Sequence, residues 1–205
     1  MADNKAKYTV ITPVAFLSYP WLDEPQPPQN LGEKAKYGTA LVFPAGTDLQ
    51  ALESVVIAAA VKKFGEGAVA QLKAGRLRNP LRSDPEDVKE KKYPAGSTFT
   101  SARSEQRPGY VFLYADPETG KPMRMPDDQV KGAFYPGAKV RAQLTAFGYD
   151  KKGNKGVGFG LNNLQLVDGD PLTAPRWDGR DAAEEAFEAE GELRPADMSD
   201  LENSR

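Results

Sequence analysis

The chain has 205 residues, 40% of them hydrophobic and 27% charged, and its formal net charge is −2. This length suits one domain with appendages, and the sequence contains neither an apolar run of roughly 18 residues, as a membrane span requires, nor a signal peptide. Because cysteine and histidine are absent, a disulfide framework and a thiolate zinc site are excluded, and the commonest general base is missing. We therefore expect a cytoplasmic protein that uses no metal or cofactor, and the missing histidine disfavours an enzyme without excluding one.

The charge is unevenly distributed along the chain. Residues 178–205 hold ten acidic and three basic side chains, a net charge of −7, whereas the preceding 177 residues hold 24 basic and 19 acidic ones, a net charge of +5. A basic body with an acidic tail favours a polyanionic ligand and a tail that binds partners or masks the body. A solubilising tail on an ordinary domain explains the same pattern. We predict a folded domain over residues 1–177 and a disordered tail over 178–205.

The first 44 residues predict two strands joined by a proline-rich loop. The first strand covers residues 7–18, and its internal proline favours an edge position or a bulge. Four prolines within residues 19–30 predict a stiff, extended loop. Tyr19 and Trp21 at its start either cap the folded body or stand exposed as a stacking surface. Residues 34–44 form the second strand, which is more deeply buried.

The pattern becomes helical over residues 48–74. Asp48 is a plausible N-cap, and apolar side chains follow it at helical spacing. We interpret this stripe as core packing and assign it no chemistry. Residues 75–96 are irregular and charged, which predicts a solvated loop.

Residues 97–102 and 110–114 predict two further strands, separated by a turn over 103–109. In the second of them, three aromatic rings alternate with Val111 and Leu113. We expect the face with Val111 and Leu113 to lie on the core. The three rings then stack on flat ligands, unless the predicted helices cover them.

Residues 134–167 predict a β-hairpin with a basic, glycine-containing tip over 150–156. On its first arm an apolar face alternates with a polar one, because side chains two apart share a face of a strand; the apolar face comprises Val140, Ala142, Leu144 and Ala146. The glycines of the second arm mark a barrel bend or the close approach of a ligand or another backbone. After Asn162 and Asn163 the alternating apolar residues shift by one position along the strand, which predicts a bulge there.

Several catalytic and phosphate-binding motifs are absent from the sequence. It contains no GxxxxGK[ST] loop, no GxGxxG fingerprint before a helix, and no GxSxG nucleophile motif. A nuclease that relies on carboxylates and metal ions stays open as an alternative; its candidate ligands are Asp116, Asp127, Asp128 and Asp150.

The order of several segments resembles the phage-encoded single-stranded DNA-binding proteins with an OB-fold. These segments are SYPWLDEP at 18–25, KAKY at 34–37, the strand and Arg-Pro-Gly turn at 98–109, YPG at 135–137, and KGVGFGLNNLQ at 155–165. The similarity covers about residues 8–170. It implies a mainly β fold, namely a five-stranded OB-fold-like antiparallel barrel with a helical insertion at about 48–74 and an acidic C-terminal tail that contacts partners.

Resemblance and residue pattern together predict sequence-independent binding of single-stranded DNA in phage replication or recombination. Rings would stack on bases and cations would neutralise phosphates. The candidate rings are Tyr19, Trp21, Tyr37, Tyr110, Phe112, Phe147 and Tyr149. The candidate cations are Lys34, Lys36, Arg103, Arg107, Lys139, Arg141, Lys151, Lys152 and Lys155.

The expected setting is the cytoplasm of a phage-infected bacterium. The expected partners are single-stranded DNA, replication or recombination proteins reached through the acidic tail, and a second copy of the chain. The alternative is a phage structural or assembly protein whose barrel mediates protein contacts.

Overall fold

The computed structural model describes residues 7–28, 32–151 and 153–168. The predicted acidic tail lies outside these residues. The strands are β1 (Thr9–Ile11), β2 (Ala15–Gln26), β3 (Lys36–Phe43), β4 (Thr98–Ser104), β5 (Gly109–Ala115), β6 (Pro122–Arg124), β7 (Lys139–Lys151) and β8 (Asn154–Asp168). The helices are α2 (Gln50–Phe64), α3 (Ala68–Lys73), α4 (Pro85–Glu90), the 3₁₀ turn η1 (Asp127–Gln129) and α5 (Val130–Ala133).

The fold is mainly β, as predicted, but one sheet joins eight strands in the order β1-β7-β2-β3-β4-β8-β5-β6. A further antiparallel pairing between β7 and β8 returns the sheet onto itself. The strands β2, β3, β4, β8 and β7 therefore form a closed circuit, in which only the β4–β8 contact is parallel. The prediction of a five-stranded antiparallel barrel is confirmed only in part, because one contact of the circuit is parallel and β1, β5 and β6 extend the sheet beyond it.

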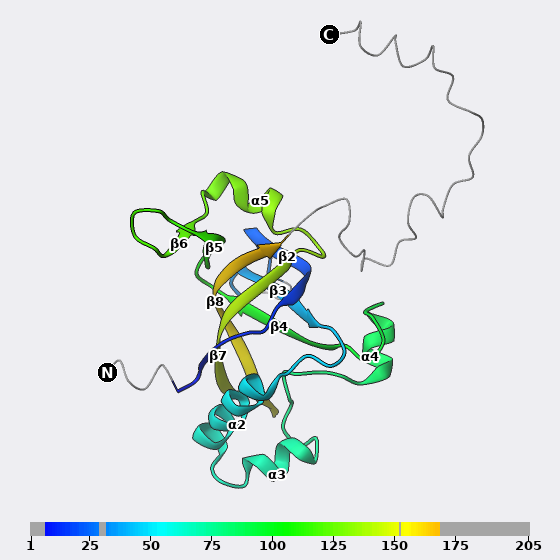
Figure 1. Cartoon of the computed structure of the whole chain (residues 1–205). Helices are drawn as coiled ribbons and strands as arrows, with labels where there is room; N and C mark the ends of the chain where they lie inside the picture. The colour runs from blue at the N-terminus through cyan, green and yellow to red at the C-terminus, as the bar shows by residue number, and fades with distance from the viewer. Residues whose placement is uncertain (1–6, 29–31, 152, 169–205) are drawn as a thin grey trace, which may run out of the picture.

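The helices lie at the two ends of this circuit and beside it. In Figure 1, α2 and α3 lie below the sheet and α5 lies above it, while α4 stands to one side near β4. The helical insertion predicted at 48–74 is confirmed, and its apolar stripe is buried at Leu52, Val56, Ala59 and Ala60. No helix in the described residues is long and apolar enough to cross a membrane.

The long hairpin β7–β8 supplies much of the core. Val140, Ala142, Leu144 and Ala146 are all buried, which confirms the predicted apolar face. The pairing jumps from Gln143 opposite Asn163 to Leu144 opposite Leu161, so Asn162 has no opposing residue. This is the bulge that the shift in alternation predicted. The strands extend to Lys151 and Asn154, so the turn is shorter than the predicted 150–156.

The N-terminal strand differs from the prediction in its middle and at its C-terminal end. It is broken between Ile11 and Ala15, and β2 then continues through the segment predicted as a loop. Pro20 lies at a register shift between Ser18 and Trp21. Proline is tolerated at such a bulge because no ladder hydrogen bond requires its missing N–H.

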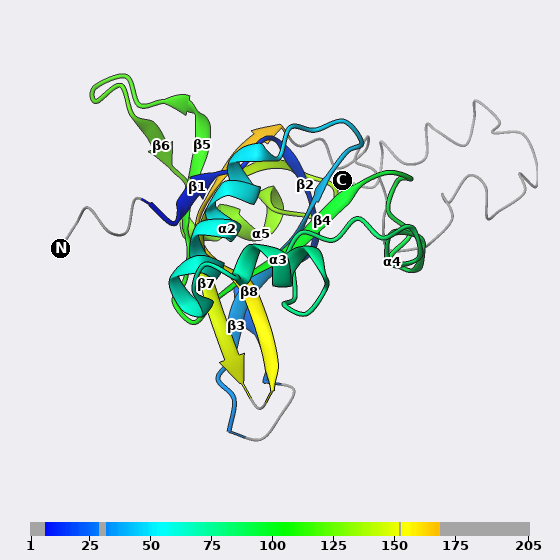
Figure 2. The same ribbon diagram turned by 90° about the horizontal axis from the view of Figure 1, so that it is seen from below.

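The face assignment of β5 was wrong. Tyr110 is only 3% exposed and its hydroxyl donates to the carbonyl of Leu22 at 2.6 Å, whereas Leu113 is 51% exposed. The rings are not covered by α2 and α3, since Tyr110 packs against Phe134 at the end of α5, at a centroid distance of 5.2 Å. Figure 2 shows the reason: β5 leaves the body with β6 as a projecting arm, so no core lies beneath Leu113.

Residues 75–96, predicted as a solvated loop, and residues 122–133, for which no strand or helix was predicted, both contain short elements. Residues 75–96 include α4, whose first turn is capped by Asp84 through the backbone N–H groups of Glu86 and Asp87. Residues 122–133 include β6, η1 and α5. Both segments are rich in charged residues and lack a long run of apolar residues at helical or strand spacing. Their short helices and strand are therefore stabilised by capping and by contacts with the sheet.

Candidate functional site

A groove of about 430 Å³ lies over β2, β3 and β4 and is bordered by the α4 segment. We call it the basic groove. It is lined by Tyr19, Trp21, Gln26, Lys36, Gly38, Thr39, Ala40, Arg82, Lys91, Tyr93, Phe99, Ser101 and Arg103. This lining combines four aromatic rings with four cations and includes no acidic side chain.

Two of the rings stand out from the sheet because β2 is irregular where they occur. Tyr19 has a φ of 48° and lies in the register shift that ends at Trp21. Their side chains are 55% and 42% exposed. Rings of this size usually bury much of their surface, so two exposed rings separated by one residue are available to stack on a flat ligand.

Gly38 makes room for a cation opposite Trp21. The two residues are paired between β2 and β3, and a Cβ at Gly38 would lie 2.9 Å from Cγ of Arg103 and 3.0 Å from the carbonyl of Ala102. Any larger residue here would displace the Arg103 side chain. The glycine therefore makes room for the Arg103 side chain of β4 beside β3, in the groove that Trp21 also lines.

The cations of the groove differ in how far they are already neutralised. Lys36 lies 3.6 Å from Glu105, and Arg82 lies 3.8 Å from Asp87 and 4.4 Å from the ring centroid of Phe99. Within the described part of the chain, Lys91 and Arg103 make no ion pair. These two side chains are the ones most ready to take an anionic ligand.

The floor of the groove is neutral and well packed. The Tyr93 hydroxyl donates to Oγ of Ser18 at 3.1 Å, and the Tyr93 ring meets that of Phe99 edge to face at 5.1 Å. Burial raises the pKa of Tyr93 above its usual value. The phenol therefore stays protonated at neutral pH and places no negative charge beneath a bound anion.

The structure brings Tyr19, Trp21, Lys36 and Arg103 of the predicted residues into this groove. Lys34 lies near its edge, where its Nζ is 3.2 Å from Glu105. Tyr37 is half-buried on β3 and pairs with Ser104.

Three predicted residues near β5 lie in other surroundings. Tyr110 is buried, so its ring cannot stack on a ligand without unfolding of β5. Phe112 stacks on Tyr114 at 4.8 Å, on the projecting arm. The guanidinium of Arg107 lies 3.5 Å from Asp127 and 3.8 Å from Asp23, so it is already paired.

The remaining predicted residues follow the β7–β8 hairpin and do not line the basic groove. Arg141 and Phe147 lie on the open face of β7, where Phe147 is 49% exposed above Gly158. Lys155 lies 3.1 Å from Asp150 near the hairpin tip. Lys139 and Lys151 are exposed, Tyr149 is half-buried, and Lys152 lies outside the described residues.

Sequence reasoning missed Arg82 and Lys91, which were assigned to a solvated loop. Arg82 is held at the groove because its backbone pairs with Phe99 of β4. The sequence Asp84-Pro85 carries the signal that could have located Lys91, because an Asp N-cap followed by proline is typical of a helix start. That short helix brings Lys91 to the groove wall.

The acidic residues considered for metal binding are dispersed. Among the described residues no three His, Cys, Asp or Glu side chains gather as a metal site. Asp116 instead accepts the backbone N–H groups of Thr119 and Glu118 at 2.9 Å, which lowers the pKa of its carboxyl.

Comparison with known proteins points to one family. A family model described as the ssDNA-binding protein of Enterobacter phage Enc34 matches residues 8–198. No curated protein matches the sequence significantly.

Three solved structures resemble the fold at low identity. The single-stranded DNA-binding protein from bacteriophage Enc34 has a TM-score of 0.59 at 18% identity, covering 88% of this chain and 90% of that one. The same phage protein in complex with ssDNA has a TM-score of 0.55 at 17% identity, covering 80% and 88%. The gp2.5 single-stranded DNA-binding protein of bacteriophage T7 has a TM-score of 0.55 at 15% identity, covering 87% and 99%.

Proposed function

The chain belongs to the family of the Enterobacter phage Enc34 ssDNA-binding protein, and on that premise we propose that it binds single-stranded DNA independently of sequence. The observation that carries the proposal is the basic groove, whose lining combines exposed rings with cations and contains no acidic side chain. The role is one of binding, in phage DNA replication or recombination, rather than of catalysis.

The rings supply the part of the affinity that tolerates any base. Tyr19 and Trp21 are exposed on one strand at the groove. Every nucleobase has a π-face, so a base–aromatic stack contributes about 1–3 kcal/mol whichever base is present. Two adjacent stacking positions therefore hold a strand without reading its sequence.

The cations supply the part that depends on salt. Lys36, Arg82, Lys91 and Arg103 line the groove and neutralise phosphates along the strand. Each neutralised phosphate of a single strand releases counterions, so log Kobs falls with log salt concentration with a slope of about −0.7 per contact. A protein that uses all four would show a slope of about −3 from these contacts.

We assign the closed circuit of β2, β3, β4, β8 and β7 to the OB-fold class of barrels. In OB-folds the face of the second and third strands binds oligonucleotides, together with the loop between strands 1 and 2 and the loop between strands 4 and 5. The corresponding strands of the circuit are β3 and β4, over which the basic groove lies.

The acidic tail is assigned to protein partners in replication or recombination, and the protein acts in the cytoplasm of the phage host. Its ten acidic side chains within residues 178–205 suit a basic surface on a partner. The same charge suits the basic groove when no DNA is bound.

The decisive experiment is a mobility shift on single- and double-stranded DNA of equal length across a salt series. We expect tight binding of the single strand at low salt, weaker binding of the duplex, and a linear loss of log affinity with log salt concentration. No binding of a dT oligonucleotide at micromolar protein would refute the proposal.

One observation favours the alternative of a structural or assembly protein. The β5–β6 arm exposes Leu113 and Tyr114, at 51% and 56%, on a strand that leaves the body. Such an arm suits a protein contact. Absence of DNA binding together with a stable complex in phage particles would favour this function. Magnesium-dependent degradation of DNA would instead favour the nuclease.

A further inference from the structure

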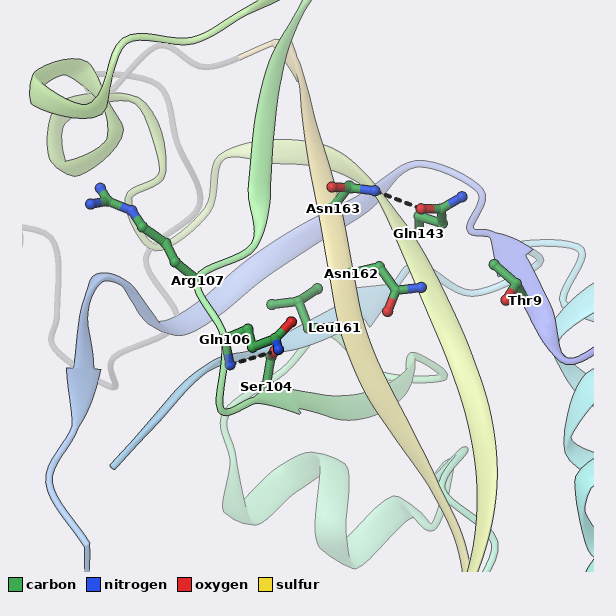
Figure 3. A pocket seen from close by; sticks show the side chains of 8 residues that line it. All are labelled: Thr9, Ser104, Gln106, Arg107, Gln143, Leu161, Asn162 and Asn163. Carbon is green, nitrogen blue, oxygen red and sulfur yellow. Dashed lines mark hydrogen bonds between the residues drawn. The ribbon is translucent and has the colours of Figure 1, made fainter. Parts of the chain in front are cut away.

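A second hollow of about 470 Å³ lies where β8 leaves β4 and joins β5. β8 pairs with β4 at Phe159 and Gly160, and with β5 from Asn163 onward. Figure 3 shows the side chains that gather at this branch. Four of them are carboxamides, namely Gln106, Gln143, Asn162 and Asn163, and we call the hollow the amide pocket.

The bulge in β8 explains why so many amides meet at one place. In a regular strand, neighbouring side chains point to opposite faces of the sheet. Here Asn163 donates from Nδ2 to Oε1 of Gln143 at 2.6 Å, while Asn162 donates from Nδ2 to Oγ1 of Thr145 at 2.8 Å. Gln143 and Thr145 share one face of β7, so both asparagines reach the same face.

These contacts leave hydrogen-bonding capacity unused. Within the described residues, Oδ1 of Asn162, Nε2 of Gln143 and the whole side-chain carboxamide of Gln106 have no hydrogen-bond partner. The pocket therefore offers donors and acceptors together. Such a set suits a ligand that itself presents donors and acceptors in one plane.

The charge of the pocket excludes a simple anion site. Its lining contains no acidic residue and a single base, Arg107. That guanidinium is paired with Asp127 and Asp23, and in Figure 3 it points away from the amides. A neutral, planar, polar ligand therefore fits better than a phosphate.

The pocket is reached from the basic groove around the end of β4. Lys36 lines the groove and lies 3.6 Å from Glu105, and the next residue, Gln106, lines the pocket. A nucleic acid strand that runs past Lys36 and around the end of β4 therefore reaches the amides. In a single strand both edges of a base are free, and adenine presents a donor beside an acceptor on each of them, N6 with N7 and N6 with N1, so that a glutamine or asparagine carboxamide can pair bidentately with either edge.

We propose that the amide pocket takes up an adenine base of the bound strand, through the carboxamides of Gln106 and Gln143. This inference rests on the proposed binding of single-stranded DNA and adds to it one position of base preference. The rest of the strand is held by stacking and phosphate contacts, so the protein binds any sequence but gains affinity where an adenine reaches the pocket.

The test compares dT oligonucleotides of equal length that contain one central dA, one central dC or no substitution. Because the protein can bind a dT strand in any register, a single dA can reach the pocket. We expect the dA oligonucleotide to bind about fivefold or more tightly than the other two. The preference should disappear in Gln106→Ala, which alters an exposed turn residue, and in the double variant Gln106→Ala/Gln143→Ala.

A matched control is Gln50→Ala, which removes an exposed carboxamide at the start of α2 that does not line the pocket. It should keep both the dA preference and the affinity for dT. Equal binding of all three oligonucleotides by the natural chain would overturn the amide pocket and leave the basic groove intact. A preference that survives in Gln106→Ala and the double variant would also overturn it. Failure to bind any of the three would refute the proposed function itself.

Discussion

Glu105 holds two lysines at the edge of the basic groove in the unbound protein. Its carboxylate oxygens lie 3.2 Å from Lys34 and 3.6 Å from Lys36. The hydrogen bond and the charge of Lys34 lower the pKa of the Glu105 carboxyl, so it remains ionised at neutral pH. A bound phosphate must compete with this carboxylate for both ammonium groups.

Replacing Glu105 by glutamine should therefore strengthen binding of single-stranded DNA. We expect Glu105→Gln to raise affinity about two- to fivefold at low salt and to steepen the salt dependence, because both lysines become available to phosphates. Fluorescence titration with a dT oligonucleotide across a salt series measures both effects. Glu118→Gln, at an exposed site in the turn between β5 and β6, makes the same change in net charge. An equal gain in both variants would show that only net charge matters.

Trp21 is the ring whose removal should cost the most affinity. It is 42% exposed at the groove, so Trp21→Ala removes a stacking surface and little core. We expect a loss of about 1–3 kcal/mol in binding free energy for every homopolymer tested. Tyr114→Ala is the control, because that ring is exposed on the β5–β6 arm and does not line the groove. Unchanged DNA affinity in Trp21→Ala would contradict the stacking role.

At the residue scale, the sequence indicated which rings and cations could bind a ligand, but it did not show which of these side chains are buried. Tyr19 and Trp21 were singled out because they adjoin a proline-rich stretch, and they do line the groove. Tyr110 was assigned to stacking on the parity of its strand, yet it is buried with its hydroxyl bonded to Leu22. The alternation of side chains along a strand assigns them to two faces, but it does not show which face packs on the core.

The short helix α4 is the element that turns an apparent loop into a groove wall. It ends at Glu90, and the next residue, Lys91, lines the groove without an ion-pair partner among the described residues. Lys91→Ala should weaken binding at all sequences alike and reduce the magnitude of the salt slope by about 0.7. Lys89→Ala, an exposed lysine of α4 that does not line the groove, should leave the slope unchanged. Equal slopes in the two variants would remove Lys91 from the interface.

The second arm of the hairpin is braced by the segment that follows α3. The backbone N–H of Arg78 donates to the carbonyl of Lys155 at 3.0 Å, and Val157 donates to the carbonyl of Arg78 at 3.0 Å. A Cβ at Gly156 would lie 2.7 Å from that same Arg78 carbonyl oxygen. The glycine is therefore required by a close backbone approach, one of the two explanations that its position in the sequence suggested.

Gly156→Ala should consequently destabilise the fold by about 1–3 kcal/mol, as overpacking does where backbone cannot move aside. Denaturant unfolding of the purified protein measures this free energy. Gly132→Ala is the comparison, because a Cβ there meets no atom within 4 Å. Unfolding at the same denaturant concentration in both variants would show that the Arg78 backbone moves aside at little cost in free energy.

At the scale of elements, the strands with a clear period of two were predictable and those without it were not. The buried face of β7 and the bulge in β8 follow from local alternation. The continuation of β2 past Pro20 depends on register shifts against β3, which no local pattern contains. No pattern of apolar residues predicts α4 either, because this highly charged segment is held in place by its contacts with β4.

The whole molecule combines a basic groove with a strongly acidic C-terminal segment. Residues 178–205 carry a net charge of −7, and their removal should raise affinity for single-stranded DNA at low salt if they compete for the groove. The difference should vanish at high salt, where exposed charges are screened. Affinity that stays equal or falls after truncation would exclude masking. A full-length chain with the acids replaced by Asn and Gln separates loss of charge from loss of length.

The overall topology could be predicted from sequence only through resemblance to a family. Composition and periodicity indicate a mainly β domain with one helical insertion. The parallel contacts of β8 with β4 and β5 join residues more than 50 positions apart in sequence, and nothing local encodes them. The resemblance predicted a five-stranded barrel, whereas the sheet of the described residues has eight strands, of which β5 and β6 attach only through β8.

The position of β8 in the chain has a consequence for biosynthesis. β8 is the strand that pairs with β7, β4 and β5 at once, and it spans Asn154–Asp168, late in the sequence. A nascent polypeptide on the ribosome cannot complete its sheet until this segment has emerged from the exit tunnel. Until then the edges of β4 and β7 remain open to other chains. A messenger RNA that is truncated, or that carries a stop codon, before codon 154 should therefore yield a product that aggregates or is degraded. It should not yield a shorter protein that still binds DNA.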